Sequence, residues 1–284
     1  SNYKIATGSL EPNGSATYTL YVWIREGVGN DVLSKHYHGK IVVNGVNISG
    51  DPVSEVVLAN LGNTGSTYDD GVDTFITGED PNNYIWYSGK LWRAVSVNNQ
   101  AKTTKLVTQW DISAIPYNVS GNVAFSGSDM EMWLNDTTVD GFLGNLRDYE
   151  NFVVTDAKWN ATLTLSSSKP AETTMVTDAV GLLNYYEYVT SYRGTTYKNG
   201  YLNNGLHWQT LTPYSTSEVR SVNRGGIADY DSPSYERGVR PSVNLKSNVK
   251  IVDGDGTVDN PYRLNGDNDT ELSGTLLSSR YSGE

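Results

Sequence analysis

Apolar and polar residues alternate along several short stretches of this chain, as they do in β-strands that bury one face. Residues 16–46 alternate in two runs on either side of a Gly-rich turn, which predicts a pair of strands. The N-terminal segment, 1–50, is short for an independent core. We therefore expect it to belong to a small β-sandwich or to pack on the rest of the chain.

The clearest strand pattern lies in "NYIWYSGKLWRAVSVN", residues 83–98. Alternation before and after Ser88-Gly89 predicts a hairpin, and "TKLVTQW" from Thr104 predicts a third strand. Residues 51–81 are instead rich in Gly, Asp, Thr and Asn, and we interpret them as a linker or irregular entry segment.

The period becomes helical after Ser128. Ser128 and Glu131 have the spacing of a capping box, and residues 140–149 repeat apolar side chains at helical spacing. A further helix is predicted within residues 177–192, with Asp178 as its N-cap. We interpret the last segment, 265–284, as a tail or the first strand of a truncated element.

Composition narrows the chemistry that the chain can perform. The sequence has no cysteine, which excludes a disulfide framework, a thiolate nucleophile and a cysteine-type zinc site. The 32 acidic residues against 21 basic ones give a net charge of -11, which disfavours nucleic acid as a partner. No apolar run approaches the length of a membrane span. The many Tyr, Gly, Asn, Ser and Thr residues are typical of exported surface proteins, so we expect a secreted or cell-surface location, with any signal peptide and anchor outside this sequence.

Four segments, in this order, resemble a family of surface domains of Gram-positive bacteria: "PNNYIWYSGKLWRAVSVN", "VGLLNYYEY", "GVRPSVNLKSNVKI" and "DGDGTVDNPYRL". The resemblance covers residues 82–264, and this range is expected to be the main domain. That family distantly resembles the formylglycine-generating-enzyme domain, a variant of the C-type-lectin-like fold, through "NRGG" from Asn223 and "GVR" from Gly238.

The resemblance implies an α+β fold. It would contain loop-rich, twisted antiparallel sheets with two or three short helices, preceded by a small all-β N-terminal segment. Formylglycine-generating enzymes use cysteines of their own, so this chain lacks that chemistry.

The arginines near the end of the main domain have two interpretations. Arg240, in "YERGVRPSVNLK", precedes a strand pattern, where a guanidinium can hold several backbone carbonyls. We interpret Arg240 as structural, with Arg220 beside it and Gly238 making the turn. The alternative is that the arginines converge on an anionic glycan or carboxylate, which Arg224 and Arg237 would then contact.

The loop "GYLNNGLHWQTLTPY" brings Asn204, Trp208 and Tyr214 close together in sequence. Aromatic rings beside amide side chains suit sugars, whose C–H faces stack while their hydroxyl groups form hydrogen bonds. The same residues also suit a loop-rich core, so both roles stay open.

Two patterns raise the question of a metal ion. "DGDGTVDN" places Asp253, Asp255 and Asp259 as in a calcium loop, but a leucine stands where the bidentate glutamate should be, and a Gly-rich hairpin turn explains the pattern better. His36 and His38 share a strand face without a third ligand. No cofactor is predicted, and calcium is the one ion that the sequence leaves open.

No G-x-S-x-G nucleophile motif occurs in the sequence. Paired carboxylates such as Asp229 and Asp231 could serve a glycosidase, but acids in Gly-rich loops are usually turn residues.

We therefore expect a non-catalytic binding or adhesion module for a glycan or a host protein. The first alternative is a subunit of a fibre, stalk or phage-like appendage that joins its neighbours by strand addition. The second alternative is a hydrolase that acts on glycans.

Overall fold

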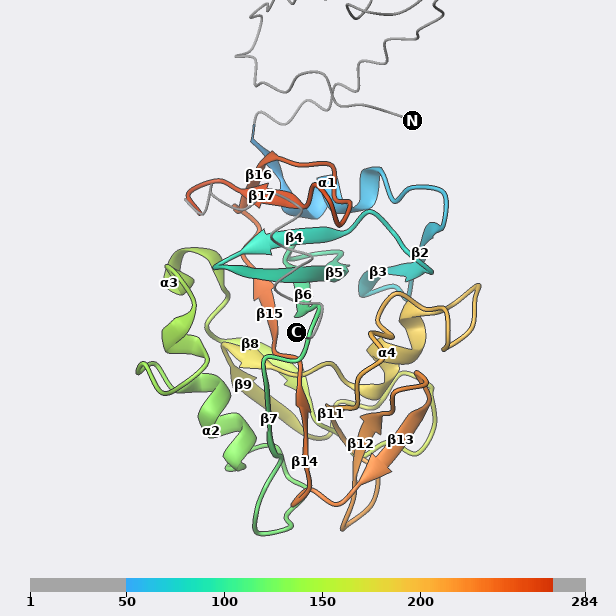
Figure 1. The fold of residues 1–284 in the computed structure, drawn as a ribbon, viewed down its shortest axis with the longest axis vertical. Coiled ribbons are helices and arrows are strands. Elements are labelled where there is room, and N and C mark those ends of the chain that lie inside the picture. Colours follow the sequence, from blue (N-terminus) through green and yellow to red (C-terminus); the bar gives the residue numbers. More distant parts are fainter. Residues whose placement is uncertain (1–49, 268–284) are drawn as a thin grey trace, which may run out of the picture. The chain divides into compact units, whose positions relative to one another are not determined.

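The computed structural model of the protein describes residues 50–267 (Figure 1). The chain divides between Ser49 and Gly50 into two compact units, and the described residues belong to the second unit. The predicted strand pair at 16–46 lies outside the described residues.

Ten strands form the largest sheet, which we call sheet A. Its main path runs β1 (Asp51–Pro52), β16 (Lys250–Asp253), β17 (Tyr262–Leu264), β4 (Tyr84–Tyr87), β5 (Lys90–Asn98), β6 (Thr104–Thr108), β15 (Ser242–Leu245) and β10 (Val180–Gly181). Strand β3 (Asp73–Gly78) pairs with β5 beyond the end of β4, and β2 (Gly65–Asp69) pairs with β3. Of these pairs only β17 with β4 is parallel.

The predicted hairpin and the third strand beside it are confirmed in sheet A. Ser88 and Gly89 have φ angles of 52° and 70°, as a type I′ turn requires. All four residues of β4 and seven of the nine residues of β5 are buried, so both faces of the sheet are covered at its centre.

Residues 51–81 are not the predicted linker. They supply β1, β2, β3 and helix α1 (Val53–Ala59), and Val53, Val57, Phe75 and Ile76 are buried. The elements are short and stand between turns, so Gly and Asp dominate the composition while a few apolar residues anchor the segment to the core.

Sheet B has five strands, β13 (Ala228–Asp231), β12 (Val219–Val222), β11 (Trp208–Pro213), β14 (Glu236–Val239) and β7 (Ser113–Pro116), in this order. Only β11 and β14 are parallel. A two-stranded sheet C pairs β8 (Ala157–Asn160) with β9 (Met175–Asp178).

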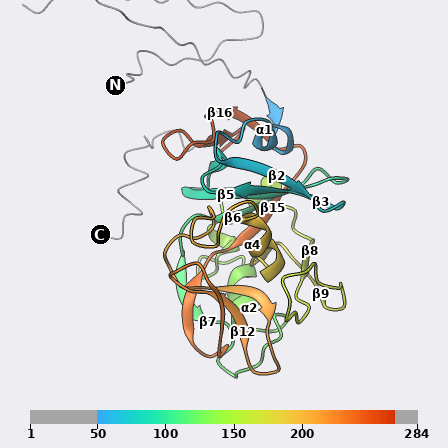
Figure 2. The ribbon, with the colours of Figure 1, turned by 90° about the vertical axis from the view of Figure 1, so that its right-hand side faces the viewer.

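Helix α4 (Tyr185–Ser191) lies between sheets A and B (Figure 2). Tyr186 packs edge-on against Phe75 of β3. Two residues later, on the opposite side of the helix, Tyr188 packs edge-on against Trp208 of β11. The helix thus joins the cores of the two sheets.

The cap of α4 is Asn184 and not the predicted Asp178. The Asn184 side chain accepts a hydrogen bond from Glu187 N, and the Glu187 carboxylate accepts one from Asn184 N, which completes a capping box. Asp178 ends β9 instead, because the chain passes through strand β10 before the helix begins.

The other helical predictions are confirmed in part. Ser128 caps α2 (Asp129–Asn135) by accepting a hydrogen bond from Glu131 N at 3.0 Å. The pattern at 140–149 forms only a short 3-10 turn, Leu143–Asn145, followed by α3 (Tyr149–Phe152).

The first residues of the predicted C-terminal tail belong to the folded unit. Asp267 accepts a hydrogen bond from Ser88 N at 2.9 Å and forms an ion pair with Arg147 at 2.8 Å. Residues 268–284 lie outside the described part of the chain.

The described unit is β-rich with a few short helices, which confirms the predicted α+β class at this level. It has four α-helices where the sequence predicted two or three. None of the helices between residues 50 and 267 is long and apolar enough to cross a membrane.

Candidate functional site

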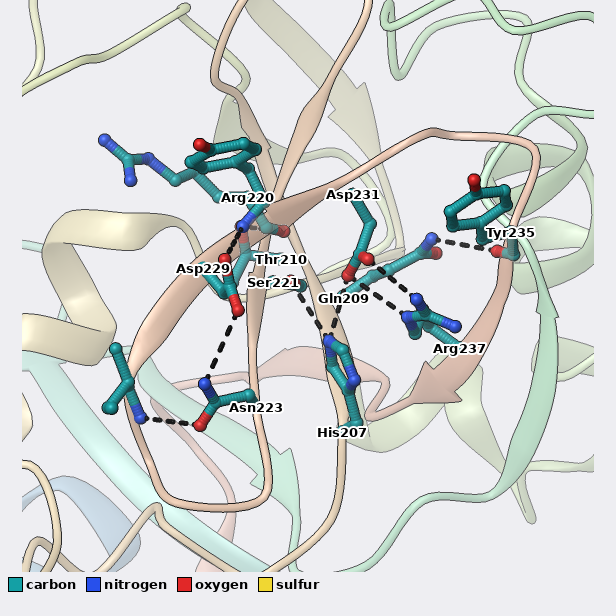
Figure 3. A network of polar contacts seen from close by, with 12 residues as sticks. His207, Gln209, Thr210, Arg220, Ser221, Asn223, Asp229, Asp231, Tyr235 and Arg237 are labelled. Carbon is teal, nitrogen blue, oxygen red and sulfur yellow. Dashed lines mark hydrogen bonds and ion pairs between the residues drawn. The ribbon is translucent and has the colours of Figure 1, made fainter.

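One face of sheet B gathers polar side chains from four strands (Figure 3). The register places Ser221 of β12 opposite Gln209 of β11 and opposite Asp229 of β13. Side chains alternate along a strand, so Asp231 lies on the same face as Asp229. We call this set the polar face, and its members are His207, Gln209, Ser221, Asp229, Asp231 and Arg237.

Asp231 connects several side chains of the polar face. Arg237 donates to both of its oxygens, from Nη2 at 2.7 Å and from Nε at 3.1 Å, and His207 Nε2 lies 2.9 Å from Oδ2. Burial acts to raise the pKa of Asp231, but hydrogen bonds from Arg237 and Ser221 outweigh it and hold the pKa below its ordinary value. The bidentate pair therefore stays charged and holds both side chains in place.

His207 and Ser221 do not form a nucleophile–base relay with Asp231. Ser221 Oγ lies 3.3 Å from His207 Nε2, the same nitrogen that contacts Asp231. A relay needs the acid and the nucleophile on opposite ring nitrogens. Ser221 is also fully buried, so its contact holds His207 against the sheet.

Tyr235 and Gln209 lie next to the contacts that Asp231 makes with Arg237 and His207. Tyr235 is 54% exposed, and its ring centre lies 5.3 Å from the guanidinium carbon of Arg237. Gln209 is fully buried, and its Nε2 donates to Tyr235 O at 3.3 Å. An exposed aromatic ring therefore lies beside polar groups that are already ordered.

Of the five residues that the sequence suggested for ligand binding, only Arg237 belongs to the polar face. Trp208 is 1% exposed, its ring lies 4.7 Å from the guanidinium carbon of Arg240, and it packs against Tyr188. A ring buried in this way has no face left for a sugar, so the binding role suggested for Trp208 is wrong. Trp208 begins strand β11, where alternation turns it away from Gln209 and toward α4.

Tyr214 lies on the other side of sheet B. Its ring stacks on that of Tyr230 at a centroid distance of 4.3 Å. Tyr230 pairs with Arg220 and not with Ser221, which places the stacked rings on the face opposite the polar face.

Asn204 and Arg224 also lie outside the polar face. The Asn204 side chain donates to Gln109 O at 3.1 Å and accepts from Leu206 N at 3.1 Å, so it stabilises its own loop. Arg224 is exposed in the turn between β12 and β13. The alternative in which the arginines converge on one anion is therefore wrong.

Arg240 has the contacts of a structural residue. It is 1% exposed, its Nε donates to Thr108 O at 2.8 Å, and its Nη1 donates to Leu202 O at 2.6 Å. Burial lowers the pKa of Arg240 to about 10, and the charge of Asp111 opposes this shift. The guanidinium thus joins the end of β6 to the loop at Leu202.

Arg220 is held by aromatic rings on the far side of sheet B. Its guanidinium carbon lies 4.4 Å from the ring centre of Tyr185 and 4.2 Å from that of Tyr214. Nη2 donates to Leu165 O at 2.8 Å. These contacts are structural.

Gly238 lies within β14 and not in the predicted turn. A Cβ at this position would lie 1.8 Å from Asp111 Oδ2 and 2.9 Å from His207 O. The close approach of the Asp111 carboxylate, and not a turn conformation, therefore requires glycine here.

The segment proposed as a calcium loop folds as a turn. Asp255 N and Gly256 N both donate to Asn260 O, and Asp255 Oδ1 accepts from Thr257 N at 3.0 Å. Asp253 Oδ1 accepts from the backbone N of Gly254 at 2.8 Å. These bonds stabilise the turn.

Metal ligands are not grouped in the described part of the chain. Between residues 50 and 267 no three His, Cys, Asp or Glu side chains, Asp253, Asp255 and Asp259 included, are placed to hold a metal ion together. His36 and His38 lie outside the described residues.

A second polar region is a cavity of about 520 Å³ lined by parts of α2, α3 and β9. Asp178 lines it and lies close to Glu131 of α2. Burial, and next the charge and hydrogen bonding of Glu131, raise the pKa of Asp178 to about 7. Asp178 is therefore mostly protonated at a pH below about 7.

The sequence contained part of the signal for the polar face. Side chains alternate along a strand, so the sequence alone indicates that Asp229 and Asp231 lie on the same face of the β13 segment. The parallel pairing of β11 with β14, which brings Arg237 and Tyr235 to those acids, has no local sequence signal.

Comparisons with known proteins find no relative: no protein-family model matches this chain, and no curated protein or solved structure is detectably similar to it.

Proposed function

We propose that this chain is a non-catalytic binding module of a secreted or cell-wall-associated bacterial surface protein, and that it binds a glycan through the polar face of sheet B. The observation that carries the proposal is the exposed ring of Tyr235 beside the ion pair of Asp231 with Arg237. Sugar recognition needs this combination, because rings stack on aromatic faces while hydroxyl groups bond to fixed polar atoms.

The rigidity of the polar face supports a binding role. Its side chains project from paired strands, and the bidentate Asp231–Arg237 contact leaves little side-chain entropy to lose when a ligand binds. The hydrogen bonds from Arg237 and Ser221 hold the pKa of Asp231 below its ordinary value, which makes this residue a poor general acid.

The sequence resemblance and the composition support the location. The ordered segments in residues 82–264 resemble surface domains of Gram-positive bacteria, and a C-type-lectin-like arrangement would present loops and sheet ends to a ligand. The proposal commits to a glycan, and a host protein is the other outcome of the test.

The test is a glycan array with the full chain, followed by titration of the strongest binder against variants. Tyr235→Ala should weaken binding by roughly tenfold or more, since loss of a stacking aromatic anchor costs more than about 1 kcal/mol. Tyr230→Ala is the matched control, because Tyr230 is 45% exposed but lies on the opposite face.

A blank array, or equal loss of binding in both tyrosine variants, would overturn this assignment. Binding to an immobilised host protein that is sensitive to Tyr235→Ala would keep the surface and change the ligand class.

The fibre or stalk alternative has one observation in its favour. Within the described residues β13 pairs only with β12, so it is an open edge of sheet B. However, Asp229 Oδ1 accepts the Tyr230 N–H at 3.0 Å, which occupies a donor that an added strand would use. Light scattering over a range of concentrations tests this alternative, which predicts growth into larger species.

A further inference from the structure

The polar face carries an excess of negative charge. Asp229 and Asp231 oppose a single guanidinium, that of Arg237, so the net charge of the face is -1 when His207 is neutral. Asp229 makes no ion pair with another described residue. Its oxygens accept only the Tyr230 N–H and a long contact of 3.5 Å from Asn223 Nδ2.

The one cation of the polar face is already occupied. Nε and Nη2 of Arg237 donate to Asp231, and Nη1 donates to Glu236 O at 3.0 Å. A ligand carboxylate or sulfate would have to displace Asp231 to obtain a bidentate contact, and it would face Asp229 as well. An anionic glycan is therefore a poor fit.

The acceptor of the polar face that a ligand can reach is Asp229. Its side chain is half-buried, and its oxygens receive only the two contacts named above from described residues. Gln209 Oε1 also has no hydrogen-bond partner among the described residues, but Gln209 is fully buried and does not select the ligand. Asp229 therefore favours a ligand that supplies N–H or O–H donors.

We infer that the ligand of the polar face is a glycan with protonated amino groups, such as an N-deacetylated hexosamine polymer. This inference rests on the proposed function. The Tyr235 ring stacks on a sugar ring, and the ammonium group of the sugar pairs with Asp229.

The test compares three probes of equal length: a glucosamine oligomer, its fully N-acetylated form, and an oligouronate, at a pH where the amines are protonated. Calorimetry with the full chain should show the glucosamine oligomer binding at least tenfold more tightly than the acetylated oligomer, with no binding of the oligouronate. Asp229→Asn should reduce affinity for the glucosamine oligomer toward that of the acetylated one.

An acidic protein attracts any polycation, so the control must remove the same charge elsewhere. Glu236→Gln does this on the same stretch of chain, one residue from both Tyr235 and Arg237, where strand alternation places its side chain on the other face. Selectivity should survive Glu236→Gln and be lost in Asp229→Asn. Equal losses in the two variants would show that attraction is nonspecific and would overturn the inference.

Failure of the inference is distinguishable from failure of the proposed function. If the acetylated oligomer binds as tightly as the glucosamine oligomer, or the oligouronate binds best, and binding depends on Tyr235, only the ligand class is wrong. If no probe binds and the glycan array is blank, the proposed function fails together with the inference.

Discussion

At the residue scale, the buried arginine Arg240 differs from the arginine of the polar face in what its guanidinium contacts. Arg240 donates to the backbone carbonyls of Thr108 and Leu202 and lies over Trp208, whereas Arg237 pairs with a half-buried carboxylate. The first arrangement stabilises the junction between the sheets, and the second leaves the pair at the surface, where a ligand can reach it.

Arg240→Ala should destabilise the protein by about 3 kcal/mol or more, because two buried carbonyls lose their donors and each costs about 1–3 kcal/mol. Arg240→Lys should recover only part of this loss, since one ammonium group cannot reproduce the planar guanidinium fork. Urea unfolding measures both. The exposed Arg224→Ala is the control, expected within about 0.5 kcal/mol of the parent, and an equally small effect of Arg240→Ala would contradict the structural role.

At the element scale, Asp178 of β9 and Glu131 of α2 make the packing of these two elements depend on pH. Burial and the charge of Glu131 raise the pKa of Asp178 from 3.8 to about 7. The folded state therefore binds this proton more tightly than the unfolded chain. The contribution to stability is fully present below about pH 4 and is lost as the pH rises to about 7.

Asp178→Asn should remove this pH dependence, because the amide stays neutral throughout. The measurement is the melting temperature of the parent and the variant at intervals from pH 4 to pH 8. The variant should gain stability relative to the parent as the pH rises. Asp140→Asn, at an exposed position, controls for the change in net charge, and parallel curves for Asp178→Asn and the parent would refute the raised pKa of Asp178.

Local sequence patterns predicted the elements whose stabilising contacts are themselves local. The hairpin at Ser88-Gly89 and the cap at Ser128 depend on neighbouring residues and are present. The predicted capping box forms only in part, because the Glu131 carboxylate accepts from Gly127 N and not from Ser128 N. The cap of α4 was misplaced because Asp178 and Asn184 are both good caps, and strand β10 decides between them. For the polar face, the sequence indicated the two acids and Arg237 separately, but not that they meet, since the pairing of β11 with β14 is a long-range contact.

At the scale of the whole molecule, α4 and Arg240 join two sheets with different roles. Sheet A is buried on both faces at its centre, while sheet B keeps one polar face with the exposed Tyr235. The cavity of about 520 Å³ at Asp178 is a second polar region that could take a ligand. The proposed function therefore requires that the ligand occupies the polar face and not this cavity.

Amide chemical-shift mapping on the isotope-labelled full chain, titrated with the tightest oligosaccharide from the array, distinguishes these regions most directly. If the ligand binds at the polar face, the perturbed amides should cluster at His207, at Asp229–Asp231 and at Tyr235–Arg237. Perturbations that instead cluster around Asp178 and Tyr149, with those strands unchanged, would contradict binding at the polar face.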